Sequence, residues 1–257
     1  MSYEVFKAVV RQGFVPIFVA GKRDVEVQLS GCRSAGLRVI EYTQRREDSA
    51  QMIPSIVQRY PDMHVLVGST LDDDGVVRSL NRKYPHLRTL AQLSALGASG
   101  FVSRMSFSEE TCRRWRATHF LMPCAGTVNE AYRQFCLGAH IIKVVRSDYE
   151  VVRQLATTPA FGFCPLFVTG GMNLETIPSV MADGVLSVGA GFDAIMGDCE
   201  DLADDAYHRE LVSRLKALQE CTLSCREKRF PGLTKSLDAE NWRETFPFAL
   251  HEDDINA

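Results

Sequence analysis

The sequence lacks a surplus of charge of either sign, because 29 lysine and arginine residues are set against 32 aspartate and glutamate residues. The net charge of −3 leaves no excess of cations to neutralise a phosphate backbone, so we expect no nucleic-acid partner. Long apolar runs are missing as well. The longest, at 14–20, is shorter than the roughly 20 residues that span a bilayer, and we expect no membrane partner.

The first residues include Glu4 and no small-residue cleavage site, so they do not have the pattern of a secretion signal. The 8 cysteines contain no CxxC pair, and no histidine stands at a ligand-like spacing from any of them. A zinc site is therefore not expected, and the free thiols would behave as small hydrophobic side chains. These features together predict a cytoplasmic protein that binds no metal.

The sequence does contain enough apolar material for a folded core. Of its 257 residues, 46% are hydrophobic and 24% are charged, which excludes disorder of the whole chain. Segments with helical spacing, such as Val25, Leu29 and Cys32, separate a series of short β-rich runs. Eight such runs follow one another at a regular interval, at 15–19, 37–43, 64–70, 100–104, 120–125, 140–145, 164–170 and 184–190.

Alternation of strands and helices favours a parallel sheet, and nearly continuous apolar runs are typical of strands covered on both faces. Eight units predict an α/β fold of the (β/α)8 TIM-barrel type, with an open doubly wound sheet as the alternative. A short N-terminal helix is expected before the first strand. The long segment after the third run is expected to form two helices, broken near Tyr84 and Pro85. We place the barrel at 1–222 and a partly ordered, C-terminal helical extension with an acidic end at 223–257.

Lys143 is the most informative single residue, because two isoleucines precede it and two valines follow it. A charged amine inside a buried strand is costly unless it is paired or neutralised. An ordinary lysine is almost fully protonated at neutral pH, whereas burial and nearby cations favour the neutral, nucleophilic amine. Lys143 is thus either a nucleophile or a residue of an edge strand that points to water.

Other polar residues end the predicted strands, where a barrel of this kind has its site. Glu41 lies between Ile40 and Tyr42, and either moves protons beside an amine or forms an ion pair with Arg45 or Arg46. Thr169, Gly170 and Gly171 follow the seventh run, and Gly191 follows the eighth. Many barrels bind phosphate there through backbone N–H groups, although such glycine turns can also simply end a strand.

Taken in order, these segments resemble the 2-keto-3-deoxy-6-phosphogluconate and 4-hydroxy-2-oxoglutarate aldolases, a family of pyruvate-dependent class I aldolases. The resemblance extends from Val15 to Asp193. It is carried by VPI at 15–17, IEYTQRRE at 40–47, VGSTL at 67–71, GASGFVSR at 97–104, MPCAGTVNEA at 122–131, GAHIIKVV at 138–145, FVTGGMN at 167–173 and SVGAG at 187–191.

The resemblance implies a homotrimer in which Lys143 forms a Schiff base with the 2-keto group of the substrate. It implies that Glu41 moves the protons, while Arg45 and Thr70 hold the carboxylate of the pyruvoyl part. The imine itself accepts the electrons of the broken bond, so no cofactor is expected. The implied reaction is that of a metal-independent carbon–carbon lyase, an aldehyde-lyase.

The sequence departs from the family pattern at four places around Lys143 and Glu41. Arg104 stands where the family has a proline, and Val144 to Ser147 replace a Phe-Phe-Pro-Ala segment. Gly191 replaces a serine, and Val19 lies near the place of an arginine that the chain lacks. Arg104 and Arg146 would add positive charge at the mouth of the barrel and bind an anionic far end of the substrate. Alternatively, both arginines point outward to acidic neighbours.

The sequence therefore predicts a class I aldolase that cleaves a 2-keto-3-deoxy (phospho)sugar acid or a 4-hydroxy-2-oxo acid to pyruvate and an aldehyde. The small-molecule 2-keto acid is the expected partner. One alternative is an aldolase-like protein that binds an anionic small molecule without turnover, which the altered pocket motivates. A second is a phosphosugar isomerase or synthase barrel that works without an imine.

Overall fold

The computed structural model describes residues 2–19, 23–157 and 164–250. Eight parallel strands form one sheet in the order β5-β4-β3-β2-β1-β8-β7-β6. The strands are β1 (Phe14–Phe18), β2 (Val39–Thr43), β3 (His64–Gly68), β4 (Gly100–Val102), β5 (Phe120–Met122), β6 (Ile142–Val145), β7 (Leu166–Thr169) and β8 (Ser187–Gly191). Each overlaps one of the eight runs expected from the sequence.

The sheet closes on itself between β5 and β6, the junction without a regular ladder. The Lys143 N–H donates to the Pro123 carbonyl at 2.8 Å, and the Ala125 N–H donates to the Lys143 carbonyl at 2.9 Å. These bonds, with the parallel bridge between Cys124 and Lys143, join the two ends of the sheet. The TIM barrel is thereby confirmed, and the open doubly wound sheet is not what the chain forms.

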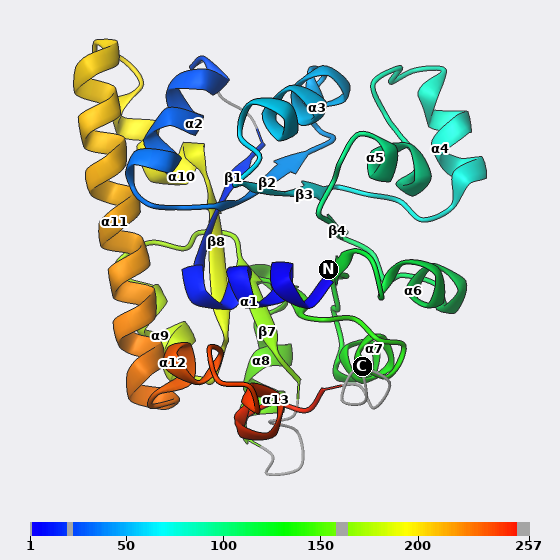
Figure 1. Cartoon of the computed structure of the whole chain (residues 1–257), viewed down its shortest axis with the longest axis vertical. Helices are drawn as coiled ribbons and strands as arrows, with labels where there is room; N and C mark the ends of the chain where they lie inside the picture. Colours follow the sequence, from blue (N-terminus) through cyan, green and yellow to red (C-terminus); the bar gives the residue numbers. More distant parts are fainter. Residues whose placement is uncertain (1, 20–22, 158–163, 251–257) are drawn as a thin grey trace.

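Helices surround the strands (Figure 1). They are α2 (Val25–Ser34), α3 (Ser49–Arg59), α4 (Asp74–Asn81), α5 (Leu90–Ala95), α6 (Glu109–Trp115), α7 (Val128–Cys136), α8 (Glu150–Thr157), α9 (Ile177–Ala182) and α10 (Phe192–Met196), with 3-10 turns η1 (Arg146–Asp148) and η2 (Gly197–Cys199). Several begin where a side chain caps the first turn, as Asp24, Thr89, Ser108 and Thr127 do. The long segment after β3 forms α4 and α5, as expected.

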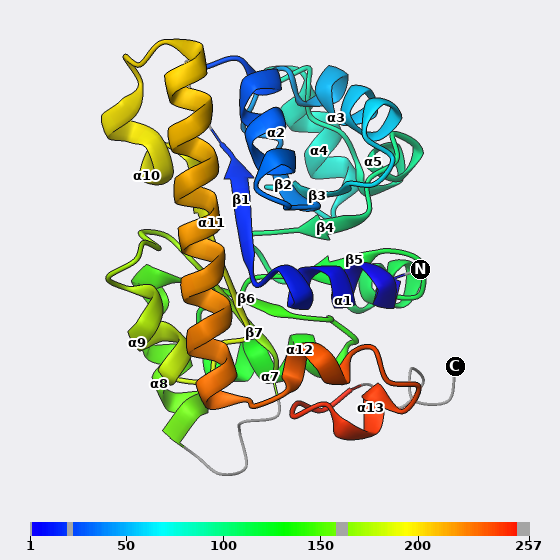
Figure 2. The ribbon, with the colours of Figure 1, turned by 60° about the vertical axis from the view of Figure 1, so that its left-hand side comes forward.

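Two apolar clusters hold the barrel together. One lies between the strands and the surrounding helices. The other fills the barrel interior, with Leu66, Phe120 and Phe167 among its members, and continues into helix α1 (Ser2–Gln12) through Phe6. Figure 2 shows α1 lying across the strands. The predicted N-terminal helix thus packs against the interior cluster and helps to close the barrel at the end away from the strand C-termini.

The C-terminal part of the chain packs against the same end. Helix α11 (Asp204–Arg229) runs along one side of the barrel, and α12 (Leu233–Ser236) and α13 (Trp242–Thr245) follow it (Figure 2). The ring of Trp242 lies 6.0 Å from that of Phe6, centroid to centroid. The expected boundary between residues 222 and 223 falls inside α11, and the division there remains a prediction. The acidic end at 251–257 lies outside the described residues.

Arg226 fastens α11 to the barrel. Its guanidinium is buried and donates to the carbonyls of Val10 and Leu186 and to the hydroxyl of Thr234. Burial lowers the pKa of Arg226 to about 10. Within the part of the chain that the structure describes, no helix is both long and apolar enough to cross a membrane.

Candidate active site

A pocket of about 460 Å³ opens at the C-terminal ends of the strands. This is the end of a TIM barrel at which active sites lie. Eight of the ten residues that the sequence singled out line it: Glu41, Arg45, Arg104, Lys143, Thr169, Gly170, Gly171 and Gly191. The remaining two, Thr70 and Arg146, do not. The fold therefore gathers at one place residues that are up to 150 positions apart in the chain.

Lys143 and Glu41 form an ion pair across the interior of the barrel. Nζ of Lys143 lies 3.2 Å from Oε1 and 3.1 Å from Oε2 of Glu41. The two side chains are only 9% and 2% exposed. Their strands, β6 and β2, stand four places apart in either direction around the ring of eight. The pair therefore joins opposite walls, and Lys143 does not point to water.

A glycine in the neighbouring strand leaves space for the carboxylate of Glu41. Gly68 ends β3, and a Cβ there would come within 2.9 Å of Glu41 Cδ and 2.8 Å of Thr43 Cγ2. The expected alternative partner Arg46 is engaged elsewhere: it binds Asp48 at 2.6 Å and the hydroxyl of Tyr42 at 2.9 Å. Lys143 is therefore the residue that pairs with Glu41.

An apolar floor lies beneath the ion pair. The ring centroid of Phe167 is 5.9 Å from Lys143 Nζ, and Phe167 belongs to the fully buried interior cluster. On this side the amine faces an aromatic ring, and on the other side it lines the pocket. Charges in such a setting interact more strongly than they do in water.

One side of the mouth is formed by the segments that follow β2 and β3. Arg45 lines the pocket there, as the resemblance implied. Thr70 does not, because it is buried and its hydroxyl donates to the Val102 carbonyl at 3.0 Å. Its neighbour Ser69 lines the pocket instead. Sequence reasoning missed Ser69 because the direction of a side chain at a strand end is not visible in a motif.

The opposite side of the mouth is formed by the ends of β7 and β8. Gly170 and Gly171 have φ values of 95° and 66°, a left-handed conformation that glycine adopts freely. Arg146 is exposed and lies against this turn, where its guanidinium donates to the Gly171 carbonyl at 3.1 Å. Asp193, which the sequence did not single out, lines the pocket next to Gly191. It stands in the first turn of α10, and a Cβ at Gly191 would overlap its carboxylate.

Arg104 reaches the pocket and is also bound by the protein. Its guanidinium lies 2.9 Å from Asp148 Oδ2 and 3.0 Å from the Cys124 sulfur. Partial burial alone would lower the pKa of Arg104, but the Cys124 thiol and Asp148 together raise it. The cation is therefore held in place, with part of its charge offset by Asp148.

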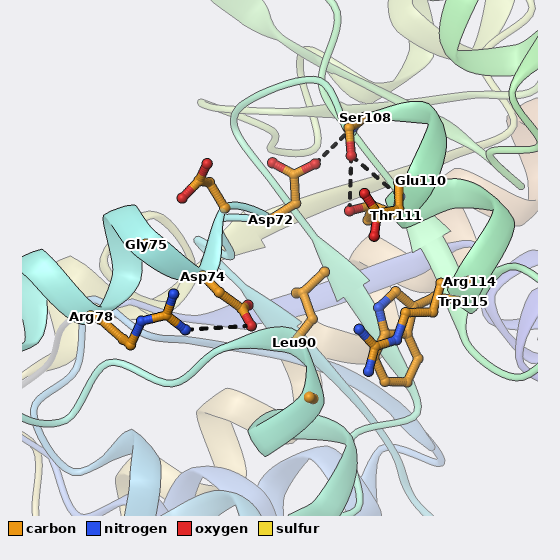
Figure 3. Close-up of a pocket in the computed structure, with 12 residues that line it drawn as sticks. Asp72, Asp74, Gly75, Arg78, Leu90, Ser108, Glu110, Thr111, Arg114 and Trp115 are labelled. Carbon is orange, nitrogen blue, oxygen red and sulfur yellow. Dashed lines mark hydrogen bonds and ion pairs between the residues drawn. The ribbon is translucent and has the colours of Figure 1, made fainter.

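A larger pocket, of about 650 Å³, lies outside the barrel mouth between α4, α5 and α6 (Figure 3). Several of its charged groups are engaged by neighbouring residues. Asp72 accepts from the Ser108 N–H at 2.7 Å, Asp74 lies 3.9 Å from Arg78, and Arg114 lies over Trp115 at 4.8 Å. No pair like Glu41 and Lys143 is present there, so we take the smaller pocket as the candidate active site.

No group of three or more histidine, cysteine, aspartate or glutamate side chains among the described residues is arranged to hold a metal ion.

No protein-family model matches the chain, and no curated protein matches it either. Solved structures do. The 2-keto-3-deoxy-6-phosphogluconate aldolase from Zymomonas mobilis has a TM-score of 0.61 and 17% identity, over 83% of this chain and 96% of its own. The Legionella pneumophila aldolase of that name, with pyruvate captured as a covalent carbinolamine, has a TM-score of 0.56 and 15% identity, over 85% of this chain and 97% of its own.

A solved structure of another kind has a similar likeness. Thiamine phosphate pyrophosphorylase from Pyrococcus furiosus has a TM-score of 0.58 and 15% identity, over 84% of this chain and 98% of its own. At these identities the likeness shows the fold and nothing finer. The chemistry has to be argued from the side chains at the barrel mouth.

Proposed function

We propose that the protein is a class I aldolase that cleaves a 2-keto-3-deoxy (phospho)sugar acid or a 4-hydroxy-2-oxo acid to pyruvate and an aldehyde. One observation carries the proposal: a buried lysine and a buried glutamate, 3.1 Å apart, at the catalytic end of a TIM barrel. An amine that forms an imine needs a proton acceptor within hydrogen-bond reach, and Glu41 meets that requirement.

The first stage forms the imine. Lys143 passes one proton from its ammonium to Glu41, and the neutral amine attacks the 2-keto carbon of the substrate. A proton then moves from the attacking nitrogen to the former keto oxygen, so that the resulting carbinolamine carries this oxygen as a hydroxyl. Glu41, now protonated, returns its proton to that hydroxyl, which leaves as water while the iminium forms. Both oxygens of Glu41 lie within 3.2 Å of the lysine nitrogen, so the proton has a short path.

The second stage breaks the C3–C4 bond. Glu41, a carboxylate again after the first stage, takes the proton of the C4 hydroxyl while the C3–C4 electron pair moves into the iminium, and the aldehyde departs. Glu41 then returns that proton to C3 of the enamine that remains, and water hydrolyses the resulting iminium, which frees pyruvate and Lys143. The iminium acts as the electron sink throughout, so the scheme uses no cofactor and no metal.

Other residues of the mouth would bind the two ends of the substrate. Arg45 offers a charge-assisted hydrogen bond to the pyruvoyl carboxylate, and we assign Thr70 a supporting place in the wall behind it. At the far end we assign Arg104 and Arg146 to the acceptor half, with the backbone of the turn at 169–171 and of Gly191. Arg104 lines the pocket, which supports its part. Arg146 would act through the turn, whose Gly171 carbonyl it binds.

A second candidate function is binding of an anionic small molecule without turnover. The ion pair itself favours it, because an ammonium held by both oxygens of Glu41 is not a nucleophile until it loses a proton. A barrel that works without an imine is a third candidate, since a pyrophosphorylase is among the similar structures.

Trapping with borohydride in the presence of pyruvate separates these candidates. The imine would be reduced to a stable adduct on the peptide that contains Lys143, and digestion with mass spectrometry would locate it. Lys143→Arg is the matched control, because it keeps a cation opposite Glu41 and removes the nucleophile. An adduct on another lysine, or none in the unchanged protein, would contradict the proposed mechanism.

We also propose that the protein is a homotrimer, which would place its solution mass near three times the 28.7 kDa of one chain. Sedimentation equilibrium measures that mass directly, and a value of one chain would contradict the proposal.

A further inference from the structure

Ser69 has a backbone conformation that serine rarely adopts. Its φ is 59°, and among the described residues it is the one non-glycine residue with a positive φ. In this left-handed region the Cβ crowds the following carbonyl oxygen, which disfavours every residue except glycine and, to a lesser degree, asparagine and aspartate. Such strain is found where the surrounding structure enforces it, and it clusters at functional sites.

Hydrogen bonds on both sides of Ser69 enforce the conformation. Before it, the Gly68 carbonyl accepts from the Gln44 N–H at 2.9 Å. After it, the Thr70 N–H donates to the Val102 carbonyl at 3.1 Å, and the Thr70 carbonyl accepts from the Ser103 hydroxyl at 2.8 Å. The chain is thus fixed to β2 on one side and to the segment at the end of β4 on the other, and residue 69 cannot relax.

The side chain that occupies this strained position faces the candidate active site. Ser69 lines the pocket together with Glu41, Arg45 and Lys143. Its hydroxyl has no hydrogen-bond partner within the described part of the chain, unlike that of Thr70. Glycine would fit the same turn without strain. The serine therefore adds one thing that glycine could not, a hydroxyl in the pocket.

The position of Ser69 also indicates what the hydroxyl binds. Thr43 and Gly68 are paired across β2 and β3. The residues just beyond these two strand ends, Arg45 and Ser69, lie on the same side of the mouth and line the same pocket. A guanidinium supplies charge, and a hydroxyl supplies one directed donor. That combination suits a carboxylate, which can accept from both.

We propose that Ser69 is a substrate-binding residue, whose hydroxyl donates to the carboxylate of the 2-keto acid that Arg45 pairs with. This inference rests on the proposed function, and it makes Ser69 a residue that selects keto acids over ketones without a carboxylate. Ser69 thus takes the part in the pocket that the resemblance implied for the neighbouring Thr70.

Two variants distinguish the effect of losing the Ser69 hydroxyl from the effect of relieving the backbone strain. Ser69→Gly removes both, whereas Ser69→Ala removes the hydroxyl and keeps the strained φ. We expect both variants to need about ten- to a hundredfold more pyruvate for half-maximal trapping by borohydride on Lys143, the range for one hydrogen bond to a charged group. Acetone is the matched probe without a carboxylate, and its trapping should be unchanged in both. The melting temperature should rise in Ser69→Gly alone.

Equal pyruvate dependence in the unchanged protein and both variants would overturn the inference, as would a parallel loss for acetone. Failure of the proposed function is recognised separately, by the absence of any adduct in the unchanged protein. Calorimetric titration with pyruvate then still tests Ser69: weaker binding in both variants supports its contact with the carboxylate. Unchanged pyruvate binding in the variants, or no binding to the unchanged protein, overturns it.

Discussion

Gly68 faces the carboxylate of Glu41 at a distance that leaves no room for a side chain. A Cβ at residue 68 would lie 2.9 Å from Glu41 Cδ and 2.8 Å from the Cγ2 of Thr43. Because Glu41 is also held by Lys143 across the barrel, this glycine helps to set the length of the ion pair. The relationship leads to the first prediction.

Gly68→Ala should push the carboxylate of Glu41 away from Lys143. We expect the rate of borohydride-trapped imine formation with pyruvate to fall by about tenfold or more, because a general base works only within hydrogen-bond reach. Overpacking of this kind costs about 1–3 kcal/mol of stability. Gly126→Ala is a suitable control, because a Cβ there would lie 3.5 Å from its nearest neighbour, Glu130 Oε2, which is an ordinary contact. A trapping rate equal to that of the unchanged protein would contradict the role given to the spacing.

Glu41→Gln should keep the fold and the binding of pyruvate while it lowers kcat by about 10²–10⁴-fold, the usual effect of a positioned proton-transfer group. The amide keeps the shape of the side chain and cannot accept the proton. Steady-state cleavage of a panel of 2-keto-3-deoxy acids gives kcat, and calorimetry gives pyruvate binding. If Glu41 were only a structural partner of Lys143, the variant would lose stability and keep its turnover per folded molecule.

The charge of the substrate's far end can be tested from two sides of the mouth. If that end is anionic, Arg104→Ala and Arg146→Ala should each raise KM for an anionic substrate by about one to two powers of ten. Asp193→Asn should lower KM for the same substrate, because a carboxylate in the pocket repels an anion. Paired substrates with and without a terminal phosphate provide the measurement. If KM in all three variants equals that of the unchanged protein, the far end of the substrate is not recognised by its charge.

His119 should make the fold less stable as the pH falls below neutrality. Its ring stacks on Phe101 at 4.8 Å, and burial lowers the pKa of His119. In the unfolded chain the imidazole has its ordinary pKa near 6.5. The unfolded state therefore takes up the proton first as pH falls from about 7.5, and the free energy of unfolding falls until the pKa of the folded state is reached.

His119→Gln removes this contribution. Urea unfolding at pH 7.5 and at pH 5.5 should show a smaller loss of stability for the variant than for the unchanged protein. An equal or larger loss in His119→Gln would mean that the histidine is protonated in the folded state at pH 5.5.

Much of the fold was predictable from the sequence, because the signals are local. Each β-rich run became a strand, since a nearly continuous apolar segment of that length is buried on both faces. Lys143 and Glu41 stood out for the same reason, as single charges within such runs. The caps at Thr89 and Ser108 likewise mark helix starts through residue types that bind the first turn.

Only the tertiary structure decided how the candidate site is assembled. Closure of the barrel brings β2 and β6 to opposite walls, which pairs Glu41 with Lys143 rather than with the arginines that follow it in the chain. Ser69 and Thr70 follow the end of β3, and the left-handed turn at Ser69 is fixed by hydrogen bonds to segments after β2 and in β4. Motifs therefore could not tell that Ser69 lines the pocket while Thr70 is buried in the wall. Asp193 lines the mouth and Arg146 binds the turn at 170–171, and both positions depend on turns whose direction is set by neighbouring strands. The local sequence thus determined which strands form and which polar residues end them. Closure of the barrel determined which of those residues come together.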